Sequence, residues 1–344
     1  MYTSRRDFTL RLRSLVLLGI ASIFMLASMN ATVRAQDLTG AGSTFINPIM
    51  TKWVAEYKKA TGVEVNYQSV GSGAGINSLI DKTVDFAGSD AIMNADDLKR
   101  AGGDVLHLPV VIGTECIAYN VPGVPSGLGF SGQIIADIFL GKIVYWDDPQ
   151  LVARNSGKKL PHEKIFTVHR SDGSGTTAIF TDYLTKVSDD WKTKVGQGKT
   201  VKWPNGLGGK GNEGVAGILK EHDYSIGYVE LAYAVENNIA YGAVENSSGK
   251  YIYPTVGSGR DAAAGFTIPE NFCIMVTNTP KASGYPIAGF TWVIVYQKSN
   301  KSAQLKKFLK WVLSDGQKYT RDLYYAPIPP SLSKREVAAI QTLQ

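Results

Sequence analysis

The sequence has no hydrophobic run of the length that a transmembrane helix needs. Its most apolar stretch, residues 15–27, would extend about 20 Å at ~1.5 Å per residue, whereas the hydrocarbon core of a bilayer is roughly 30 Å thick. Arg5, Arg6, Arg11 and Arg13 precede this stretch. A basic segment followed by a short apolar one is typical of an export signal. The length disfavours the alternative, a membrane anchor.

Small residues mark the end of this signal. Val33-Arg34-Ala35 fits the cleavage pattern, so the mature chain is expected to begin at Gln36, with no cysteine nearby to accept a lipid. Ser4-Arg5-Arg6-Asp7-Phe8 resembles a twin-arginine signal, although Thr9 and Leu10 depart from its usual ending. The sequence leaves the export route open.

Cysteine and histidine are scarce, with two and four residues. Two cysteines without clustered histidines do not make a zinc site, and no other metal or cofactor is predicted. In an exported protein, Cys116 and Cys273 allow one disulfide that closes a very long loop. Two separate buried thiols are the alternative, and the sequence leaves both open.

The mature chain also lacks a strong net charge. The formal charge of +6 falls to about +2 once the arginines and the aspartate of the first 35 residues are removed. A nucleic-acid partner is therefore not expected. Residues 36–344 are enough for two lobes of ordinary domain size.

Short predicted strands alternate with amphipathic helices, which indicates an α/β fold. Helices are predicted over 44–62, 303–313 and 334–342 and around 76–80 and 179–184, and strands over 63–67, 84–89 and 165–169. The glycine-rich residues 203–214 and the small, polar residues 244–264 are predicted to be loops. Residues 206–211 match a dinucleotide-binding pattern, but no buried strand precedes them, which argues against a nucleotide site.

Three predicted strand-to-helix junctions, residues 40–45, 70–75 and 170–176, are rich in glycine and hydroxyl residues. A helix N-terminus carries about half a positive charge and unpaired N–H donors, so three that converge would bind a tetrahedral anion. Ligands of open α/β sheets usually lie at such junctions. The alternative for each is an ordinary helix cap or turn.

Three charged residues favour the anion site. Arg170 precedes the third junction and presents a planar fork of donors suited to phosphate oxygens. Asp172 is placed to hold that fork, and Asp90 closes the strand over 84–89. A surface ion pair of Arg170 and Asp172 is the alternative, and for Asp90 a helix cap.

Blocks of sequence from residue 40 to about 230 resemble the periplasmic phosphate-binding proteins of the PstS family. They are GAGSTF at 40–45, GSGAG at 71–75, TVDFAGSD at 83–90, GKIVYWDD at 141–148, RSDGSGTT at 170–177, VKWPNGLGGKGNEGV at 201–215 and SIGYVE at 225–230. The likeness weakens beyond residue 250, and the cysteines are not part of the pattern. The resemblance implies a two-lobed type II periplasmic binding protein fold, each lobe a mixed sheet flanked by helices, with the ligand in the cleft between lobes that close by a hinge rotation.

The resemblance also implies the lobes and the site. Lobe 1 would comprise residues 36–120 and 291–344, and lobe 2 residues 121–290, after the signal over 1–35; the chain would cross near 119–122 and return near 289–293. By position, the ligand contacts are Thr44, Phe45 (through its backbone N–H), Ser72, Asp90, Arg170, Ser174, Gly175 and Thr176. Asp172 would support Arg170 without touching the ligand.

The expected function is capture of inorganic phosphate in the periplasm and its delivery to the membrane permease of an ABC transporter with its ATPase, by a monomer that is not an enzyme. Asp90 would reject sulfate. The main rival is a hydrolase that uses Ser72 or Ser174, but none of the four histidines lies in a recognisable motif and the G-x-S-x-G pattern is absent from the three junctions. A sulfate or molybdate receptor would keep the fold and change the anion.

Overall fold

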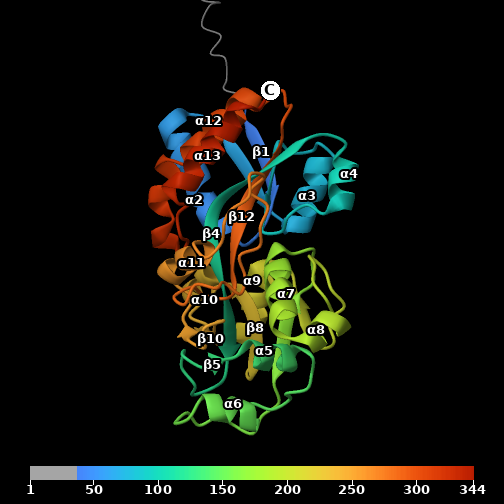
Figure 1. Ribbon diagram of the computed structural model, residues 1–344, viewed down its shortest axis with the longest axis vertical. Coiled ribbons are helices and arrows are strands. Elements are labelled where there is room, and N and C mark those ends of the chain that lie inside the picture. The colour runs from blue at the N-terminus through green and yellow to red at the C-terminus, as the bar shows by residue number, and fades with distance from the viewer. Residues whose placement is uncertain (1–36) are drawn as a thin grey trace, which may run out of the picture. The chain divides into compact units, whose positions relative to one another are not determined.

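The computed structural model describes residues 37–344, so the predicted signal over residues 1–35 lies outside the described residues. A long strand, β4 (Val105–Asn120), organises the fold. Its first part pairs with β12 (Ala288–Tyr296) and its last part with β8 (Ser225–Glu230), with the change of neighbour between Thr114 and Glu115. Figure 1 shows β4 passing from one set of elements into the other. We call these sets lobe 1 and lobe 2.

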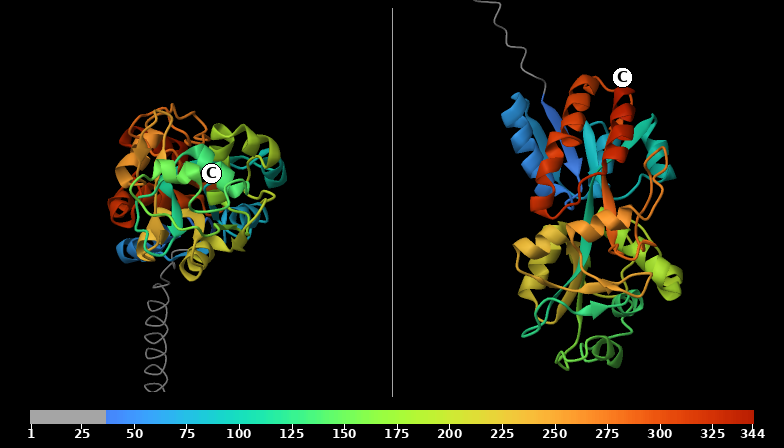
Figure 2. Two further views of the ribbon diagram at one scale, coloured as in Figure 1. Left: turned by 90° about the horizontal axis from the view of Figure 1, so that it is seen from below. Right: turned by 60° about the vertical axis from the view of Figure 1, so that its left-hand side comes forward.

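Lobe 1 is built on a mixed sheet in the order β2-β1-β3-β12-β4. The pairs β1–β2 and β1–β3 are parallel, whereas β12 is antiparallel to both of its neighbours. The other elements are β1 (Leu38–Gly42), β2 (Val65–Ser69), β3 (Phe86–Ser89), α2 (Asn47–Thr61), α3 (Ser72–Ile80), α4 (Ala95–Ala101), α12 (Ser302–Val312), the 3-10 turns Asp315–Tyr319 and Arg321–Leu323, and α13 (Pro330–Gln341). Figure 2 shows α12 and α13 beside α2, so the first and last parts of the described chain share this lobe.

Lobe 2 continues the sheet from β4 through β8 and β6 to β7, while β9 also pairs with β4. A second, three-stranded sheet has the order β11-β10-β5. The strands are β5 (Gly129–Phe130), β6 (Phe166–Arg170), β7 (Leu207–Gly209), β9 (Ala240–Tyr241), β10 (Ala243–Glu245) and β11 (Tyr251–Ile252). The helices are α5 (Gly132–Phe139), α6 (Pro149–Arg154), α7 (Gly175–Val187), α8 (Asp189–Lys194), α9 (Gly211–Glu221), α10 (Leu231–Glu236) and α11 (Val256–Ala263), the last of which packs on β4 and β12.

Local sequence explains where several helices begin and end. Pro48 lies in the first turn of α2, where its missing N–H is harmless, and Gly62 ends the helix in a left-handed conformation at φ 72°. Asn94 caps α4 by accepting a hydrogen bond from Asp97 N. Thr255 and Ser258 form the same kind of capping box at α11. These caps fix the directions in which the helices leave the sheet.

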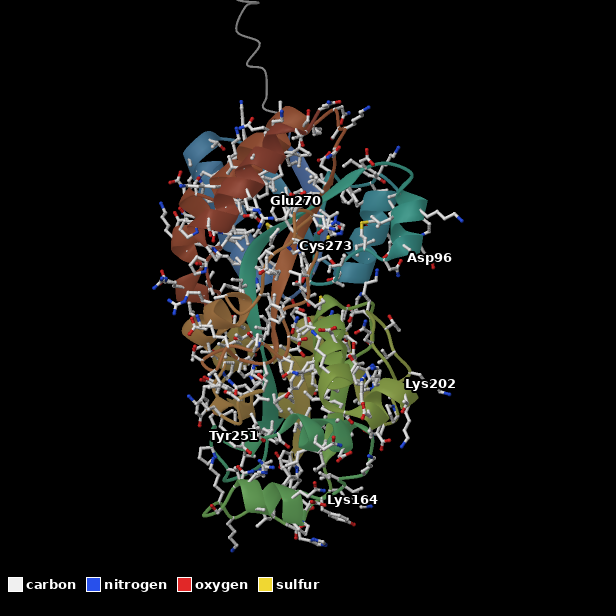
Figure 3. The ribbon with its side chains drawn as sticks, viewed as in Figure 1. Asp96, Lys164, Lys202, Tyr251, Glu270 and Cys273 are labelled. Carbon is white, nitrogen blue, oxygen red and sulfur yellow. The ribbon has the colours of Figure 1, made fainter. Side chains whose placement is uncertain are left out.

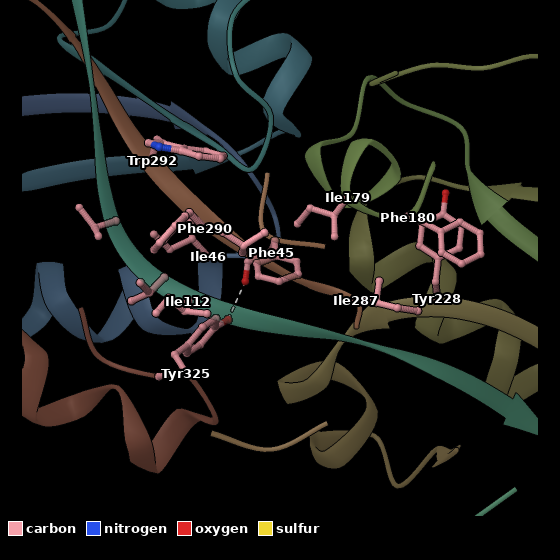
Figure 4. Close-up of a cluster of buried hydrophobic side chains, with 14 of the residues drawn as sticks. Phe45, Ile46, Ile112, Ile179, Phe180, Tyr228, Ile287, Phe290, Trp292 and Tyr325 are labelled. Carbon is pink, nitrogen blue, oxygen red and sulfur yellow. Dashed lines mark hydrogen bonds between the residues drawn. The ribbon is translucent and has the colours of Figure 1, made fainter. Parts of the chain in front are cut away.

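The hydrophobic core continues across the change of neighbour on β4. Figure 4 shows Phe45, Ile112, Phe290 and Tyr325 packed on the lobe 1 side, and the Tyr325 hydroxyl donates to Phe45 O at 2.6 Å. All four side chains are at most 1 % exposed. This packing fixes the turn that precedes α2, because Phe45 belongs to that turn.

The structure confirms the α/β class and the helices predicted from periodicity but corrects both predicted loops. The first, over 203–214, contains β7 and the start of α9, and the second, over 244–264, contains part of β10, β11 and all of α11. β7 pairs with β6, so tertiary pairing overrides the weak strand propensity of its two glycines. The capping box formed by Thr255 and Ser258 is a local signal for α11. It was overlooked because the small, polar composition of residues 244–264 favoured a loop.

The two cysteines are separate thiols. Cys116 is fully buried on β4, where its Sγ contacts Val229 O at 3.4 Å. Cys273, labelled in Figure 3, is half-buried in a loop before β12. Of the two alternatives, the structure therefore adopts the pair of thiols. The predicted lobe boundaries stay a prediction.

Candidate functional site

The three predicted junctions all lie at helix N-termini. Thr44 and Phe45 precede α2, Ser72 is the first residue of α3, and Ser174 caps α7. The first two helices follow β1 and β2 of lobe 1, and α7 follows β6 of lobe 2. The site is thus built at the ends of strands from both lobes.

Glycines let the two lobes touch at this point. Gly73 N donates to Gly173 O at 2.8 Å, which joins α3 to the turn before α7. A Cβ on Gly175 would lie 2.4 Å from Ser72 Oγ and 2.5 Å from Asp90 Oδ2, closer than side-chain carbons approach. Gly175 is therefore required by the contact between lobes.

The site residues of lobe 1 form one wall of the candidate site, and those of lobe 2 form the other. Asp90 is the charged residue of the lobe 1 wall and is 1 % exposed. Ser43 Oγ donates to both of its oxygens at 2.6 and 2.7 Å, and Thr291 Oγ1 donates to Oδ1 at 2.6 Å. Ser72 Oγ lies 3.4 Å from Oδ2 and accepts from Asp90 N. Burial raises the pKa of Asp90 to about 6, against the hydrogen bonds, which lower it.

Arg170 is the charged residue of the lobe 2 wall, and its side chain is 1 % exposed. Nε and Nη2 donate to the two oxygens of Asp172 at 2.8 and 2.6 Å, and Nη1 donates to Thr176 Oγ1 at 3.1 Å. Burial alone would raise the pKa of Asp172, but hydrogen bonds and the charge of Arg170 hold that pKa below its ordinary value. The surface ion pair considered for these residues is wrong, since Asp172 is only 15 % exposed.

A guanidinium has five N–H donors, so these three bonds leave two for a ligand. Asp172 also accepts from Gly211 N at 3.0 Å, which ties the ion pair to the start of α9. A Cβ on Gly71, whose φ is +90°, would lie 2.3 Å from Asp172 Oδ2. The guanidinium is therefore held by Asp172 and Thr176, and Asp172 is itself held by Gly211 N.

Asn212 is a residue that sequence reasoning missed. It lies in the first turn of α9, is fully buried, and its Nδ2 donates to Thr44 Oγ1 at 2.8 Å and to Thr176 Oγ1 at 3.2 Å. It thus links the lobe 1 and lobe 2 junctions. The sequence block at 201–215 contained it, but the segment was predicted to be a loop.

The remaining predicted residues have partners of their own. Ser174 Oγ accepts from Thr177 N at 3.0 Å, so the helix-cap alternative holds for this hydroxyl. Phe45 N donates to Ser43 Oγ at 3.0 Å. Asp90 does not cap the next helix, because Asn94 does. The structure therefore brings together the predicted residues of both lobes, and adds Ser43, Asn212 and Thr291.

The described residues show no arrangement of a serine hydrolase. His169, beside Arg170 in sequence, stacks on Trp203 with ring centroids 4.6 Å apart, and its Nδ1 contacts Arg170 O. His107 accepts from Met93 N instead. Within residues 37–344 neither Ser72 nor Ser174 contacts a histidine, and no group of acidic residues, histidines and cysteines could hold a metal. In the same range no helix has the length and apolar character to cross a membrane.

Two hollows in the surface lie away from the candidate site. One of about 600 Å³ is lined by Lys82, Asp85, Asp104 and Tyr296, and another of about 570 Å³ by apolar residues that include Leu207. Neither includes a predicted site residue. The candidate site is instead closed inside the protein.

Comparisons with known proteins show what this chain is similar to in sequence and in fold. A model of the PBP superfamily domain matches residues 28–316. The phosphate-binding protein PstS of Xylella fastidiosa is 42% identical over 308 residues, which cover 88% of this chain and 84% of that protein. The PstS of Pasteurella multocida is 41% identical over 336 residues and covers 96% of each chain. A solved structure of a high affinity periplasmic phosphate-binding protein bound with phosphate has a TM-score of 0.70 at 20% identity, covering 88% of this chain and 93% of that one.

These likenesses confirm the predicted fold class. The chain has the two-lobed type II periplasmic binding protein fold, in which each lobe is a mixed sheet flanked by helices. In lobe 2 the pairs β6–β7 and β6–β8 are parallel, and β4 is antiparallel to β8 and β9.

Proposed function

Because the chain belongs to the PstS family of phosphate-binding proteins, we propose that it binds inorganic phosphate between its two lobes and passes it to the permease of a phosphate-specific ABC transporter. The observation that carries the proposal is the pairing of a clamped guanidinium on one lobe with a buried carboxylate on the other. Arg170 keeps two N–H donors for the ligand, and Asp90 is the acceptor.

The ligand would be held by the predicted set. Backbone N–H groups in the first turns of α2, α3 and α7 have no carbonyl one turn earlier, and they attract an anion. Gly175 and Thr176 lie in the first turn of α7, and the hydroxyl of Ser72 opens α3. The N–H of Phe45 would exchange its bond to Ser43 for one to the ligand. Asp172 acts through Arg170.

Asp90 would select phosphate over sulfate. A buried carboxylate repels a dianion unless the ligand carries a proton that it can share. Inorganic phosphate has three ionisable protons. The second pKa of about 6 in phosphate esters indicates that no more than two are lost near neutral pH, so inorganic phosphate keeps at least one hydroxyl. Sulfate is fully ionised at this pH. Asp90 already holds Ser43 and Thr291 as donors, so the ligand hydroxyl would be a further donor.

The same relatives and the sequence support a proposal for where the protein acts and with which partners. We propose export to the periplasm with cleavage near Ala35, a monomeric receptor without catalytic activity, and partners among the inner-membrane permease subunits with their ATPase. Support comes from the names of the relatives and from the basic and apolar pattern before Gln36. Phosphate itself is the cargo, and no cofactor is required.

The test is calorimetry of the mature protein with inorganic phosphate, with a phosphatase assay on the same preparation. We expect one phosphate per chain and no turnover of phosphate esters. Native mass spectrometry of protein purified without refolding should retain a phosphate adduct. Ester hydrolysis that depends on Ser72 or Ser174 would refute the receptor and favour a hydrolase, and tighter binding of sulfate or molybdate would keep the fold but change the anion.

A further inference from the structure

Two buried glutamates are paired in the register of the sheet where β4 passes between the lobes. Glu115 on β4 and Glu230 on β8 are both 0 % exposed. They are directly paired in the antiparallel register, so their side chains leave the sheet on the same face. Thr114, one residue before, still pairs with β12 of lobe 1. The pair therefore lies at the point about which the lobes would separate.

The two carboxyls are poorly satisfied. Neither side-chain oxygen of Glu115 has a hydrogen-bond partner among residues 37–344. Oε2 of Glu230 accepts from Ala232 N at 2.8 Å and from the Tyr325 hydroxyl at 3.3 Å, but its Oε1 has no partner in the same range. An ionised carboxylate in such surroundings is strongly unfavourable. Both are therefore held as neutral carboxylic acids in this closed structure.

The surroundings reinforce this state. Burial raises the pKa of Glu115 well above its ordinary value, the charge of Asp90 raises it further, and Arg170 opposes them. Burial also raises the pKa of Glu230. The titratable groups whose charges act on the pair, or on which it acts, are Asp90, Cys116, Arg170, Tyr228, Tyr233, Glu236, Tyr285 and Tyr325. On the other helices against β4, Asp182 pairs with Lys186 on α7 and Arg260 with Asp261 on α11. On α9, Glu213 accepts from the Tyr233 hydroxyl, and Lys220 and Glu221 are exposed.

We propose that Glu115 and Glu230 form a proton-binding site that fills when the lobes close on phosphate and empties when they open. The inference rests on the proposed function. Separation of the lobes at β4 would admit water to the pair, and a hydrated glutamate is ionised at neutral pH. Closure expels that water, so each carboxylate takes one proton from hydronium or a buffer acid: the O–H or N–H bond of that acid breaks as the O–H bond of the carboxyl forms.

The sign of the linkage follows. The closed state binds the proton more tightly, so phosphate affinity is favoured at low pH and declines as pH rises through the pKa that the pair has when closed. Opening at the permease would return the proton to solvent. Phosphate release and proton release are then one event.

The chain supplies a matched control. Glu336 on α13 is also 0 % exposed, both of its oxygens lack partners among the described residues, and burial raises its pKa to about 9. It lies within lobe 1, however, on a helix that packs against α12. Movement at β4 should leave it buried, so Glu336 should not take up a proton when phosphate binds.

The experiment is calorimetric titration with inorganic phosphate in Tris and HEPES buffers, whose different ionisation enthalpies report the protons taken up per phosphate. It compares the wild type with Glu115→Gln, Glu230→Gln and Glu336→Gln between pH 7 and pH 9. We expect Glu115→Gln to take up fewer protons than the wild type, by up to about one, and its dissociation constant to rise less with pH, by up to about tenfold less per pH unit. Glu336→Gln should match the wild type. Protons from phosphate and Asp90 contribute to every protein and cancel in the difference.

The inference would be overturned if the wild type, Glu115→Gln and Glu230→Gln all bind phosphate and take up equal numbers of protons per phosphate. That result would leave the proposed function intact. An equal decrease in Glu336→Gln would also overturn it. Absence of phosphate binding in the wild type would instead refute the proposed function. If Glu115→Gln does not fold by circular dichroism, Glu230→Gln carries the same comparison.

Discussion

Asp90 on lobe 1 and Arg170 on lobe 2 are both almost completely buried, but the lobes hold them differently. Within residues 37–344, the hydrogen bonds to the Asp90 oxygens all come from hydroxyl groups, those of Ser43, Ser72 and Thr291. Arg170 is bound bidentately by a carboxylate, Asp172. The charge of Asp90 therefore has no ionic partner in its own lobe, whereas that of Arg170 is neutralised and its orientation fixed.

This difference suggests that the lobe 2 wall determines affinity for the anion and the lobe 1 wall determines selectivity between anions. A guanidinium locked by a carboxylate presents its free N–H donors in one geometry, which suits affinity for any tetrahedral oxyanion. A carboxylate that has hydroxyl partners but no ionic partner can accept a further hydrogen bond only from a ligand that brings a proton, which suits selectivity. Changes to the lobe 1 wall should alter the ratio of affinities for two anions, and changes to the lobe 2 wall should alter both affinities together.

The largest effect is expected for Asp90→Asn on selectivity. The amide can donate a hydrogen bond to sulfate and removes the buried charge that repels it. Discrimination that rests on an unmet polar group can reach roughly 10⁴–10⁵-fold, and we expect the variant to lose much of it. Competition calorimetry with phosphate and sulfate measures the ratio, with Asp81→Asn on the exposed C-cap of α3 as the control. An unchanged ratio would show that Asp90 is not the selector.

Asp90 should also make the phosphate-free protein sensitive to pH, because its partners Ser43, Ser72 and Thr291 all belong to lobe 1 and stay with it when the lobes separate. Its pKa is raised by burial from 3.8 to about 6, so its contribution to stability is complete below about pH 4 and is lost as pH rises through 6. At about 1.4 kcal/mol per pKa unit, the loss approaches about 3 kcal/mol at pH 7.5. Urea unfolding at pH 5 and pH 7.5 should show a smaller decrease for Asp90→Asn than for the wild type. Parallel decreases in the two proteins would mean that the lobes open and hydrate Asp90 when phosphate is absent.

Arg170→Lys tests the other wall. A point charge replaces the bidentate fork, and we expect phosphate binding to weaken by about 1.5–3 kcal/mol, the range for hydrogen bonds to charged groups. The ratio of phosphate to sulfate affinity should stay the same, in contrast to Asp90→Asn. Arg154→Lys, at an exposed ion pair with Glu245, is the matched control. A changed ratio in Arg170→Lys would contradict the assignment of affinity to the lobe 2 wall and selectivity to the lobe 1 wall.

The comparison also explains how much of the site the sequence predicted. Arg170, Asp172, Ser174 and Thr176 lie within one short turn, so local spacing was enough to group them. Asp90 was found from the end of a predicted strand and from the family resemblance. Local spacing and the family resemblance were therefore enough to propose the residues of both walls from the sequence.

What the sequence missed depends on contacts between distant segments. Thr291 is 201 residues from Asp90 and reaches it because β12 lies beside β3 in the sheet. Asn212 was missed because α9 begins in a glycine-rich segment that local propensity assigns to a loop. Glu115 and Glu230 become a pair only through the register of β4 with β8. Propensity and periodicity carry no information about such pairings.

The smallest effect on phosphate binding is expected for an ion pair that joins the two lobes outside the site. Lys199, in the loop after α8, forms an ion pair with Asp97 on α4 at 2.5 Å, and Asp96 and Lys202 mark the two joined segments in Figure 3. The pair links lobe 2 to lobe 1, so it stabilises the closed state rather than either wall. Burial alone would raise the pKa of Asp97, but the hydrogen bond and charge of Lys199 contribute to a pKa below the ordinary value.

Lys199→Gln should therefore weaken the binding of phosphate and of sulfate equally, by about 0.2–1 kcal/mol, because Asp97 keeps its ion pair with Arg100 when the Lys199 charge is removed. Loss of closure should appear mainly as faster dissociation. The difference between variant and wild type should shrink in 1 M salt, where the screening length is about 3 Å, and as pH falls and Asp97 takes up a proton. Stopped-flow release of phosphate measures the rate, with Lys192→Gln, which lies on α8 and forms no ion pair among the described residues, as the control. A change in the ratio of phosphate to sulfate affinity would mean that this ion pair affects the geometry of the site and does more than stabilise the closed state.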